Sequence, residues 1–116
     1  MDKKSIGDSA EQKACEFLQA KGLVLVTRNY RCYHGEIDLI MQDGDEIVFV
    51  EVRSRARIDY GYAIETVDYH KQKKLLNTAT HFLQQKNWLD IVDCRFDVIG
   101  FLNNNIEWIK DAFIYE

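Results

Sequence analysis

The spacing of apolar residues changes along the chain between the helical and the strand period, and it first predicts a helix. The segment Asp8-Ser9-Ala10-Glu11 is typical of a helix start, with Asp8 as the cap and Glu11 three residues later. Gly22 is typical of the position just after a helix. Between them lies an apolar stripe at helical spacing, made of Ala10, Ala14, Phe17 and Leu18. A short apolar strand, 23–27, follows.

The remaining pattern predicts two hairpins separated by a long helix. Strands 36–42 and 46–53 flank the turn Asp43-Gly44-Asp45. A charged, glycine-bearing loop over 54–65 precedes an amphipathic helix over 66–85. Strands 95–102 and 106–110 close the chain. The order α-β-β-β-α-β-β predicts an α/β or α+β fold with a mixed central sheet flanked by helices. No proline-rich or repetitive stretch interrupts 1–116, so we expect a single domain.

Composition narrows the class of protein. The 116 residues are 47% hydrophobic and 29% charged, as in soluble globular domains. No apolar run approaches the roughly 18 residues of a membrane span, and no apolar stretch follows the first five residues. The three cysteines are an odd number and lack CxxC spacing, which argues against a disulfide framework or a zinc site. We therefore expect a cytoplasmic protein without membrane contact.

The charge distribution excludes a globally basic DNA-binding protein. The net charge is −4, whereas phosphate binding requires positive charge. Residues 28–86 balance nine basic residues with nine acidic ones, and residues 87–116 carry two basic and six acidic residues. A local basic surface is therefore compatible only with the middle of the chain.

The register of the first hairpin decides which side chains share a face. A two-residue turn at Gly44-Asp45 pairs Asp43 with Glu46. Counting outward, we expect one apolar core face formed by Met41, Leu39 and Ile37 opposite Val48, Val50 and Val52. The other face begins apolar and ends charged, with Asp38 opposite Glu51 and Glu36 opposite Arg53. A turn at Asp43-Gly44 would change these pairs but not the faces.

Two facing carboxylates, Asp38 and Glu51, point to a metal. Like charges opposite each other destabilise a sheet, and Mg²⁺ or Mn²⁺ between them would relieve the repulsion. The alternative is a solvent-facing sheet face on which Arg53 pairs with a carboxylate. Glu11 borders the buried helical stripe, so it either joins the site or completes a capping box with Asp8. Lys71 lies on the apolar line of the second helix and either reaches the open end of the sheet or runs along apolar surface.

The segments Gly35-Glu36-Ile37-Asp38-Leu39-Ile40 and Phe49-Val50-Glu51-Val52-Arg53-Ser54-Arg55 together resemble the PD-(D/E)xK nuclease signature in the form seen in the YraN-like family. That family comprises small bacterial proteins with a restriction-endonuclease-like fold, akin to archaeal Holliday-junction resolvases. Parts of 7–11, 28–31, 61–71 and 95–97 also resemble it, so the resemblance covers about residues 7–113.

The resemblance implies roles for individual residues. Asp38 and Glu51 would be catalytic metal ligands, joined by the Val52 carbonyl and by Glu11. Arg53 stands where many such nucleases have a catalytic lysine. Arginine stays protonated and cannot act as a base, but it can bind phosphate or stabilise negative charge. Activation of the attacking water would then fall to the metal.

These inferences lead to three hypotheses of function. The first is a metal-dependent endonuclease that hydrolyses phosphodiester bonds in structured or branched DNA. Its phosphate contacts would come from Arg28, Arg31, Arg55, Arg57 and Lys71. The second is a non-catalytic nucleic-acid-binding module on the same fold, and the third is a protein-interaction domain whose acidic last third docks a basic partner. Since resolvase-like proteins often dimerise, a homodimer stays open by analogy.

Overall fold

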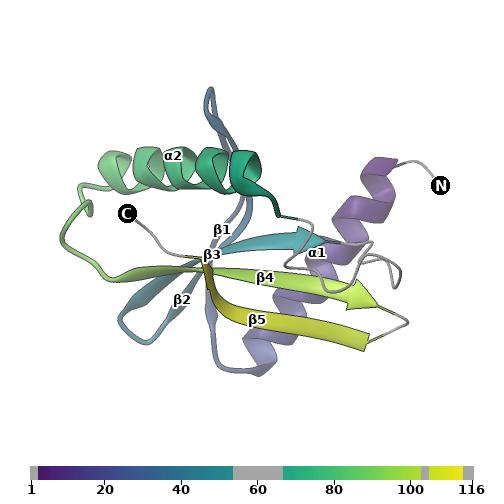
Figure 1. Cartoon of the computed structure of the whole chain (residues 1–116). Helices are drawn as coiled ribbons and strands as arrows, with labels where there is room; N and C mark the ends of the chain where they lie inside the picture. The colour runs from purple at the N-terminus through teal and green to yellow at the C-terminus, as the bar shows by residue number, and fades with distance from the viewer. Residues whose placement is uncertain (1–2, 54–66, 103–104, 114–116) are drawn as a thin grey trace.

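The computed structural model describes residues 3–53, 67–102 and 105–113, and the side chains of 9–53, 67–101 and 105–113 (Figure 1). Its elements follow the expected order of helices and strands. They are α1 (Lys3–Ala20), β1 (Val24–Cys32), β2 (Gly35–Asp43), β3 (Glu46–Arg53), α2 (Tyr69–Gln85), β4 (Cys94–Leu102) and β5 (Asn105–Phe113).

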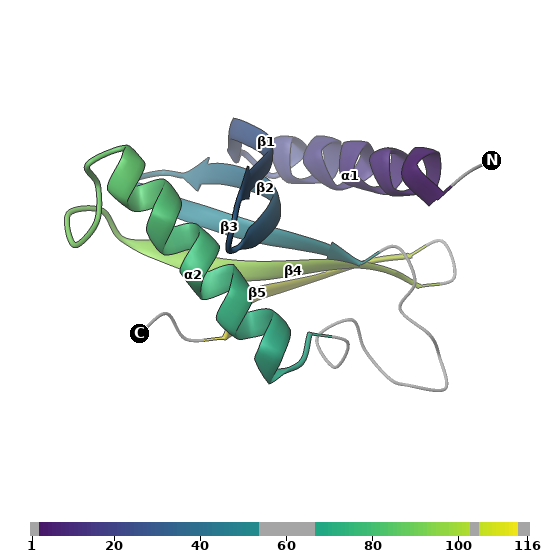
Figure 2. The same cartoon turned by 90° about the horizontal axis from the view of Figure 1, so that it is seen from above.

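The five strands form one mixed sheet in the order β1-β2-β3-β4-β5. Neighbouring strands are antiparallel except β3 and β4, which run parallel because α2 lies in the connection between them. Figure 2 shows α1 and α2 on opposite sides of the sheet. The expected mixed sheet flanked by helices is therefore confirmed.

Each helix covers its own hydrophobic core. On the α1 face, Ala14 and Leu18 pack with sheet residues Leu39, Met41, Val48, Val50 and Ile99. On the α2 face, Leu75, Ala79, Phe82 and Leu83 pack with Ile40, Ile47, Phe49, Phe96 and Val98. The apolar stripes expected on both helices thus face the sheet. No helix in the described part of the chain is long and apolar enough to cross a bilayer.

The ends of the helices match the sequence pattern only in part. Gly22 has φ +99, and the N–H of Leu23 donates to the Leu18 carbonyl, as in a Schellman motif. The expected cap at Asp8 is wrong, because α1 already begins at Lys3 and Asp8 lies inside it. Residues 3–6 favour helix well enough to extend it by another turn. Helix α2 begins at Tyr69 because the Asp68 side chain caps it by accepting from the Lys71 N–H at 2.9 Å.

The hairpin of β2 and β3 has the expected register near its turn. Pairing runs from Asp43–Glu46 to Leu39–Val50, and it ends there. The expected sheet pairs Asp38–Glu51, Ile37–Val52 and Glu36–Arg53 do not form. Instead, the Val52 N–H donates to the Asp38 carboxylate at 2.8 Å. The two strands therefore part beyond Leu39, and we call this open end the fork.

One residue of β2 lies on the face opposite to that expected. Ile37 was expected beside Leu39, but it packs in the α2 core with Ile40. The neighbouring strand is irregular at the same place, because β1 pairs Arg28 with Leu39 and Tyr30 with Ile37, and the intervening Asn29 has φ +53. A positive φ interrupts the alternation of side chains between the two faces.

At the opposite end of the sheet, a buried aspartate connects neighbouring strands through hydrogen bonds. Asp97 is fully buried and accepts from Arg95 Nε at 3.0 Å, Trp108 Nε1 at 3.0 Å and the Asp111 N–H at 2.9 Å. Arg95 also forms ion pairs with Asp43 and Glu46 beside the hairpin turn. This network joins β4 and β5 to the turn of the hairpin, so the sheet is held at one end and open at the fork.

Candidate functional site

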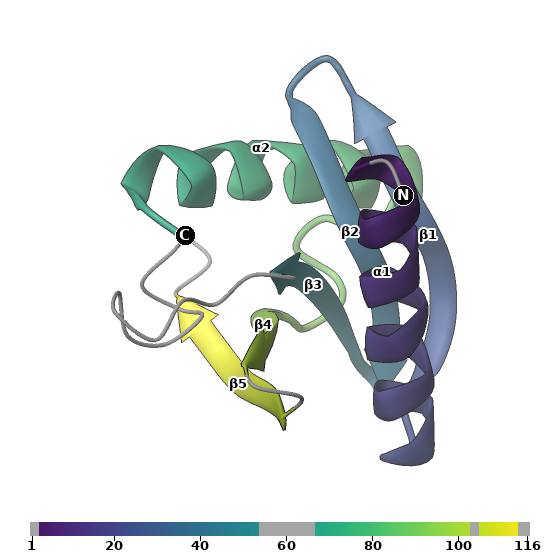
Figure 3. The same ribbon diagram turned by 90° about the vertical axis from the view of Figure 1, so that its right-hand side faces the viewer.

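Four carboxylates converge at the fork from three different elements. Carboxylate oxygens of Glu11, Glu36 and Asp38 lie within 4.8 Å of one another. The Glu51 carboxyl is close enough to that of Asp38 to raise its pKa. Glu11 belongs to α1, Glu36 and Asp38 belong to β2, and Glu51 belongs to β3. Figure 3 shows α1 running alongside β1 and β2, with β3 diverging from β2.

Asp38 lies at the centre of this cluster. Burial, the hydrogen bond with Glu51 and the negative charge of Glu51 raise the pKa of Asp38 to about 9. The hydrogen bond from the Val52 N–H lowers this pKa, and the charge of Glu11 raises it further. The Asp38 carboxyl therefore gives up its proton less readily than an ordinary aspartate, and a bound cation would relieve the same repulsion.

Glu11 is oriented by a residue that the sequence pattern did not identify. Glu11 is only 8% exposed although it is charged. With its amide nitrogen turned toward α1, Asn29 donates to both carboxylate oxygens of Glu11, at 2.8 and 3.1 Å. Glu11 thus joins the site instead of completing a capping box. Asparagine tolerates the left-handed backbone conformation better than most residues, and that tolerance was the one signal for Asn29 in the sequence.

Two cations approach the buried carboxylate of Glu51. Its Oε2 lies 3.3 Å from Arg53 Nη2 and 3.3 Å from Lys71 Nζ. Of the two alternatives for Lys71, the structure therefore shows the one in which it reaches the open end of the sheet. Because Lys71 lies in the first turn of α2, both helices contribute a side chain to the fork.

Glu36 is the second residue of the site without an assigned role in the sequence analysis. Its Oε2 accepts from Arg31 Nε at 2.7 Å. Arg53, expected opposite Glu36, contacts Glu51, so the expected pairing of Arg53 with a carboxylate is present but with a different partner. The available signal was the position of Glu36 two residues before Asp38, which is the strand period.

Only some of the expected phosphate-binding residues contact the carboxylate cluster. Arg31 is exposed beside Glu36, and Lys71 contacts Glu51. Arg28 donates through Nη1 to Gln12 on α1 at 2.7 Å, which holds it at the α1 side of the sheet. Arg55 and Arg57 lie outside the described residues. Val52 reaches the cluster through its N–H, and a metal contact of its carbonyl stays a prediction.

The chemistry of the donor set fits a hard divalent cation. All four acidic side chains offer carboxylate oxygen, which Mg²⁺ and Mn²⁺ prefer over nitrogen or sulfur. No histidine or cysteine in the described part of the chain joins the group. The cluster therefore combines oxygen ligands on one side with two cationic donors on the other.

Comparisons with known proteins place this chain in a family. The model of the uncharacterised protein family UPF0102 matches residues 10–101. A UPF0102 protein of Nitrosococcus oceani is 46% identical over 114 residues, covering 95% of this chain and 92% of the relative. One from Coxiella burnetii is 46% identical over 112 residues, covering 96% and 93%. The UPF0102 protein YraN of Salmonella agona is 49% identical over 114 residues, covering 97% and 87%. The chain belongs to the UPF0102 family.

Proposed function

We propose that this protein is a metal-dependent phosphodiesterase of the restriction-endonuclease-like fold, with DNA as its substrate. The observation that carries the proposal is the convergence of Glu11, Glu36, Asp38 and Glu51 at the fork beside Lys71 and Arg53. A stable fold gains nothing from gathering acidic side chains in a half-buried place, because like charges and desolvation both oppose it. A ligand that carries positive charge explains the arrangement.

Asp38 and Glu51 would hold the cation, with Glu11 and Glu36 completing the set of carboxylates around it. When bound, Mg²⁺ or Mn²⁺ would stabilise negative charge on a phosphodiester oxygen and make a water molecule a better nucleophile. Asn29 would keep Glu11 in position through its two hydrogen bonds. Because these side chains belong to elements that are distant in sequence, the site forms only when the chain is folded.

Arg53 and Lys71 would receive the scissile phosphate. Both are positive donors at the rim of the cluster, 3.3 Å from the same Glu51 oxygen. Arg53 keeps its proton, so its role is to bind phosphate oxygens and to stabilise charge that develops on them. Lys71 supplies an ammonium group on the α2 side of the same carboxylate. The site therefore contains a lysine from α2, although Arg53 occupies the strand position at which many such nucleases have their catalytic lysine.

The second candidate function is a nucleic-acid-binding module without catalysis. The observation that favours it is Arg53, which replaces the lysine of many related nucleases and forms an ion pair with a carboxylate that the metal would need. In that case Arg53 and Lys71 would neutralise Glu51 permanently. This candidate predicts binding of DNA without metal uptake or cleavage.

The decisive experiment measures metal uptake and cleavage together. Mn²⁺ should bind in calorimetric titration and raise the melting temperature, because a ligand of the folded state stabilises that state. Linear, nicked, flapped and four-way-junction DNA incubated with Mg²⁺ or Mn²⁺ should show which structure is cut. Asp38→Asn with Glu51→Gln should abolish metal uptake and cleavage.

The matched control for that experiment is Asp45→Asn, which removes an exposed carboxylate in the hairpin turn far from the fork. It should behave as the unmodified protein does. Equal melting shifts with Mn²⁺ in the unmodified chain and the double variant would contradict a metal site at the fork. Binding of DNA without cleavage or metal uptake would establish the second candidate.

A further inference from the structure

The turn between β1 and β2 carries an exposed aromatic side chain close to the fork. Tyr33 is 87% exposed, the most of the large hydrophobic side chains in the described part of the chain. Figure 1 shows this turn projecting above α2, away from the body of the sheet. Glu36, a member of the carboxylate cluster, follows Tyr33 by three residues. The ring therefore stands at the edge of the candidate site.

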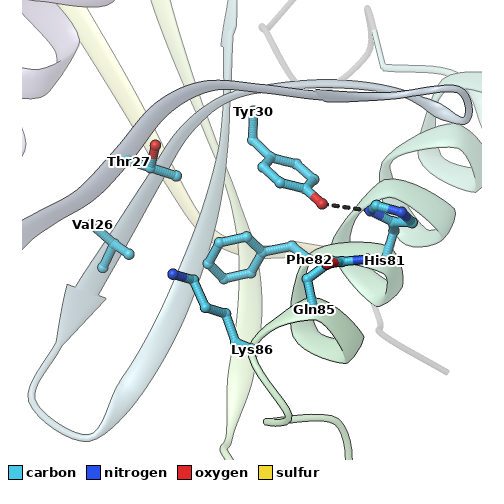
Figure 4. A pocket seen from close by; sticks show the side chains of 7 residues that line it. All are labelled: Val26, Thr27, Tyr30, His81, Phe82, Gln85 and Lys86. Carbon is cyan, nitrogen blue, oxygen red and sulfur yellow. Dashed lines mark hydrogen bonds between the residues drawn. The ribbon is translucent and has the colours of Figure 1, made fainter.

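A row of aromatic and imidazole rings connects Tyr33 to the α2 core. Its ring lies 4.0 Å from that of His34, tilted by 36°, and the His34 ring is 6.2 Å from that of His81 on α2. Tyr30 is hydrogen-bonded through its hydroxyl to His81 Nδ1, as Figure 4 shows, and packs edge-on against Phe82 of the α2 core. The row leads from the core to the surface, so the exposed ring has a defined position.

Two positive side chains lie beside the same turn. Arg31 is 73% exposed and is held by Glu36. Lys74 of α2 is exposed and lies beside Gly35, where a Cβ atom would stand 3.8 Å from its own Cβ. Tyr33 lies in the turn directly beyond the last pair of β1 and β2, Cys32–Gly35, and the pair before it joins Arg31 to Glu36.

We propose that Tyr33 stacks on an unpaired base of a nucleic acid bound at the fork. The inference deepens the proposed function and rests on its nucleic-acid part. A ring at the tip of a hairpin needs the open face of a base, which the interior of a duplex does not offer. Arg31 and Lys74 would contact the phosphates between that base and the fork. The substrate class is thus DNA with a single-stranded segment next to the scissile phosphate.

The test compares DNA binding by fluorescence anisotropy in EDTA, with a labelled single strand and a blunt duplex of the same sequence. The unmodified protein should prefer the single strand. Tyr33→Ala should lose about tenfold in affinity for the single strand, within the range measured for base stacking, while Tyr33→Phe should retain it. A 2-aminopurine in the single strand should be quenched by the unmodified protein and by Tyr33→Phe.

Ile91→Ala is the control for loss of an exposed apolar side chain, because Ile91 is 77% exposed near the hairpin-turn end of the sheet, where the Ile47 N–H donates to Asp93. It should bind as the unmodified protein does. Equal single-strand affinity of Tyr33→Ala and the unmodified protein would overturn the stacking role, even if metal-dependent cleavage is found. Tyr33-dependent binding without Mn²⁺ uptake would support the inference while refuting the enzyme.

Discussion

At the scale of single residues, Asp38 combines burial, a neighbouring carboxyl and a backbone donor. Its folded-state pKa of about 9 lies above the ordinary value of 3.8, so the folded chain keeps a proton that the unfolded chain releases. Between about pH 4 and pH 9 the folded state therefore binds more protons, and stability falls as pH rises. The penalty is the cost of keeping this proton at a pH where the unfolded carboxyl is ionised, and a bound cation that takes the place of the proton would remove it.

Because the raised pKa of Asp38 costs stability at neutral and alkaline pH, we predict that Asp38→Asn stabilises the protein there. In EDTA at pH 8, the free energy of unfolding should rise by about 1 kcal/mol or more, because the amide needs no proton to be accommodated in the fold. The gain should shrink toward pH 4, where the native carboxyl is protonated in both states. Urea unfolding at several pH values measures the effect, with Asp45→Asn as the exposed control. A pH-independent difference would contradict the pKa assignment.

Arg53 and Lys71 allow a second prediction at this scale. Removing one donor beside developing negative charge costs on the order of 10² in rate, so Arg53→Ala and Lys71→Ala should each lower cleavage by about that factor. Arg53→Lys should preserve or raise the rate, because a positive donor remains. Single-turnover cleavage with Mn²⁺ measures this.

Lys73→Ala is the control for those variants, since Lys73 is exposed on the same helix. Equal rates for all Arg53 and Lys71 variants would assign both cations to structure alone. If the unmodified chain and Arg53→Lys are both inert on every substrate while DNA still binds, the module without catalysis becomes the better description.

At the scale of elements, the approach of the β1–β2 hairpin to α2 positions Glu36 and Tyr33. Gly35 makes this approach possible. It has φ +150, and a Cβ atom there would lie 3.2 Å from Thr78 Oγ1 and 3.8 Å from Lys74 Cβ. Thr78 cannot yield easily, because it is fully buried and its hydroxyl donates to the Lys74 carbonyl at 2.8 Å.

We therefore predict that Gly35→Ala destabilises the protein by about 1–3 kcal/mol and also weakens Mn²⁺ binding, since Glu36 is its neighbour. Gly22→Ala is the comparison, because Gly22 has φ +99 but no atom within 4 Å of the added Cβ. It should cost about 1 kcal/mol and leave Mn²⁺ affinity unchanged. Thermal unfolding and calorimetry distinguish the two, and equal Mn²⁺ affinities would contradict the role of the close contact.

At the scale of the whole molecule, charge limits how DNA is bound. The net charge of −4 opposes long-range attraction, so a few local phosphate contacts must carry affinity. Log affinity should fall against log salt with a slope of about −0.9 per phosphate contacted on duplex DNA. Arg31→Ala and Lys71→Ala should each flatten that slope by about 1.

Lys110→Ala is the control for the salt series, because Lys110 lies over the Trp108 ring on β5, the strand at the other edge of the sheet. Anisotropy titrations over a salt series measure all three variants. An unchanged slope in Arg31→Ala and Lys71→Ala would place the binding surface elsewhere on the molecule.

The order of elements and the register near the hairpin turn were determined by the sequence alone. Both depend on local patterns: apolar periodicity, the turn around Gly44 and the glycine at position 22. These patterns identify which face of each helix is apolar and pair Asp43 with Glu46. They also identified Asp38 and Glu51 as candidates, because the alternation of side chains along a strand predicts which nearby residues share a face.

Only the tertiary structure decided how the fork is built. Ile37 packs in the α2 core beside the positive φ of Asn29 on β1, and the Val52 N–H donates to Asp38 where a sheet pair was expected. Glu11 and Lys71 come from helices on opposite faces and meet β2 and β3 where these strands part. Local periodicity cannot encode these contacts, because each depends on how elements distant in sequence pack around the place where β2 and β3 no longer pair.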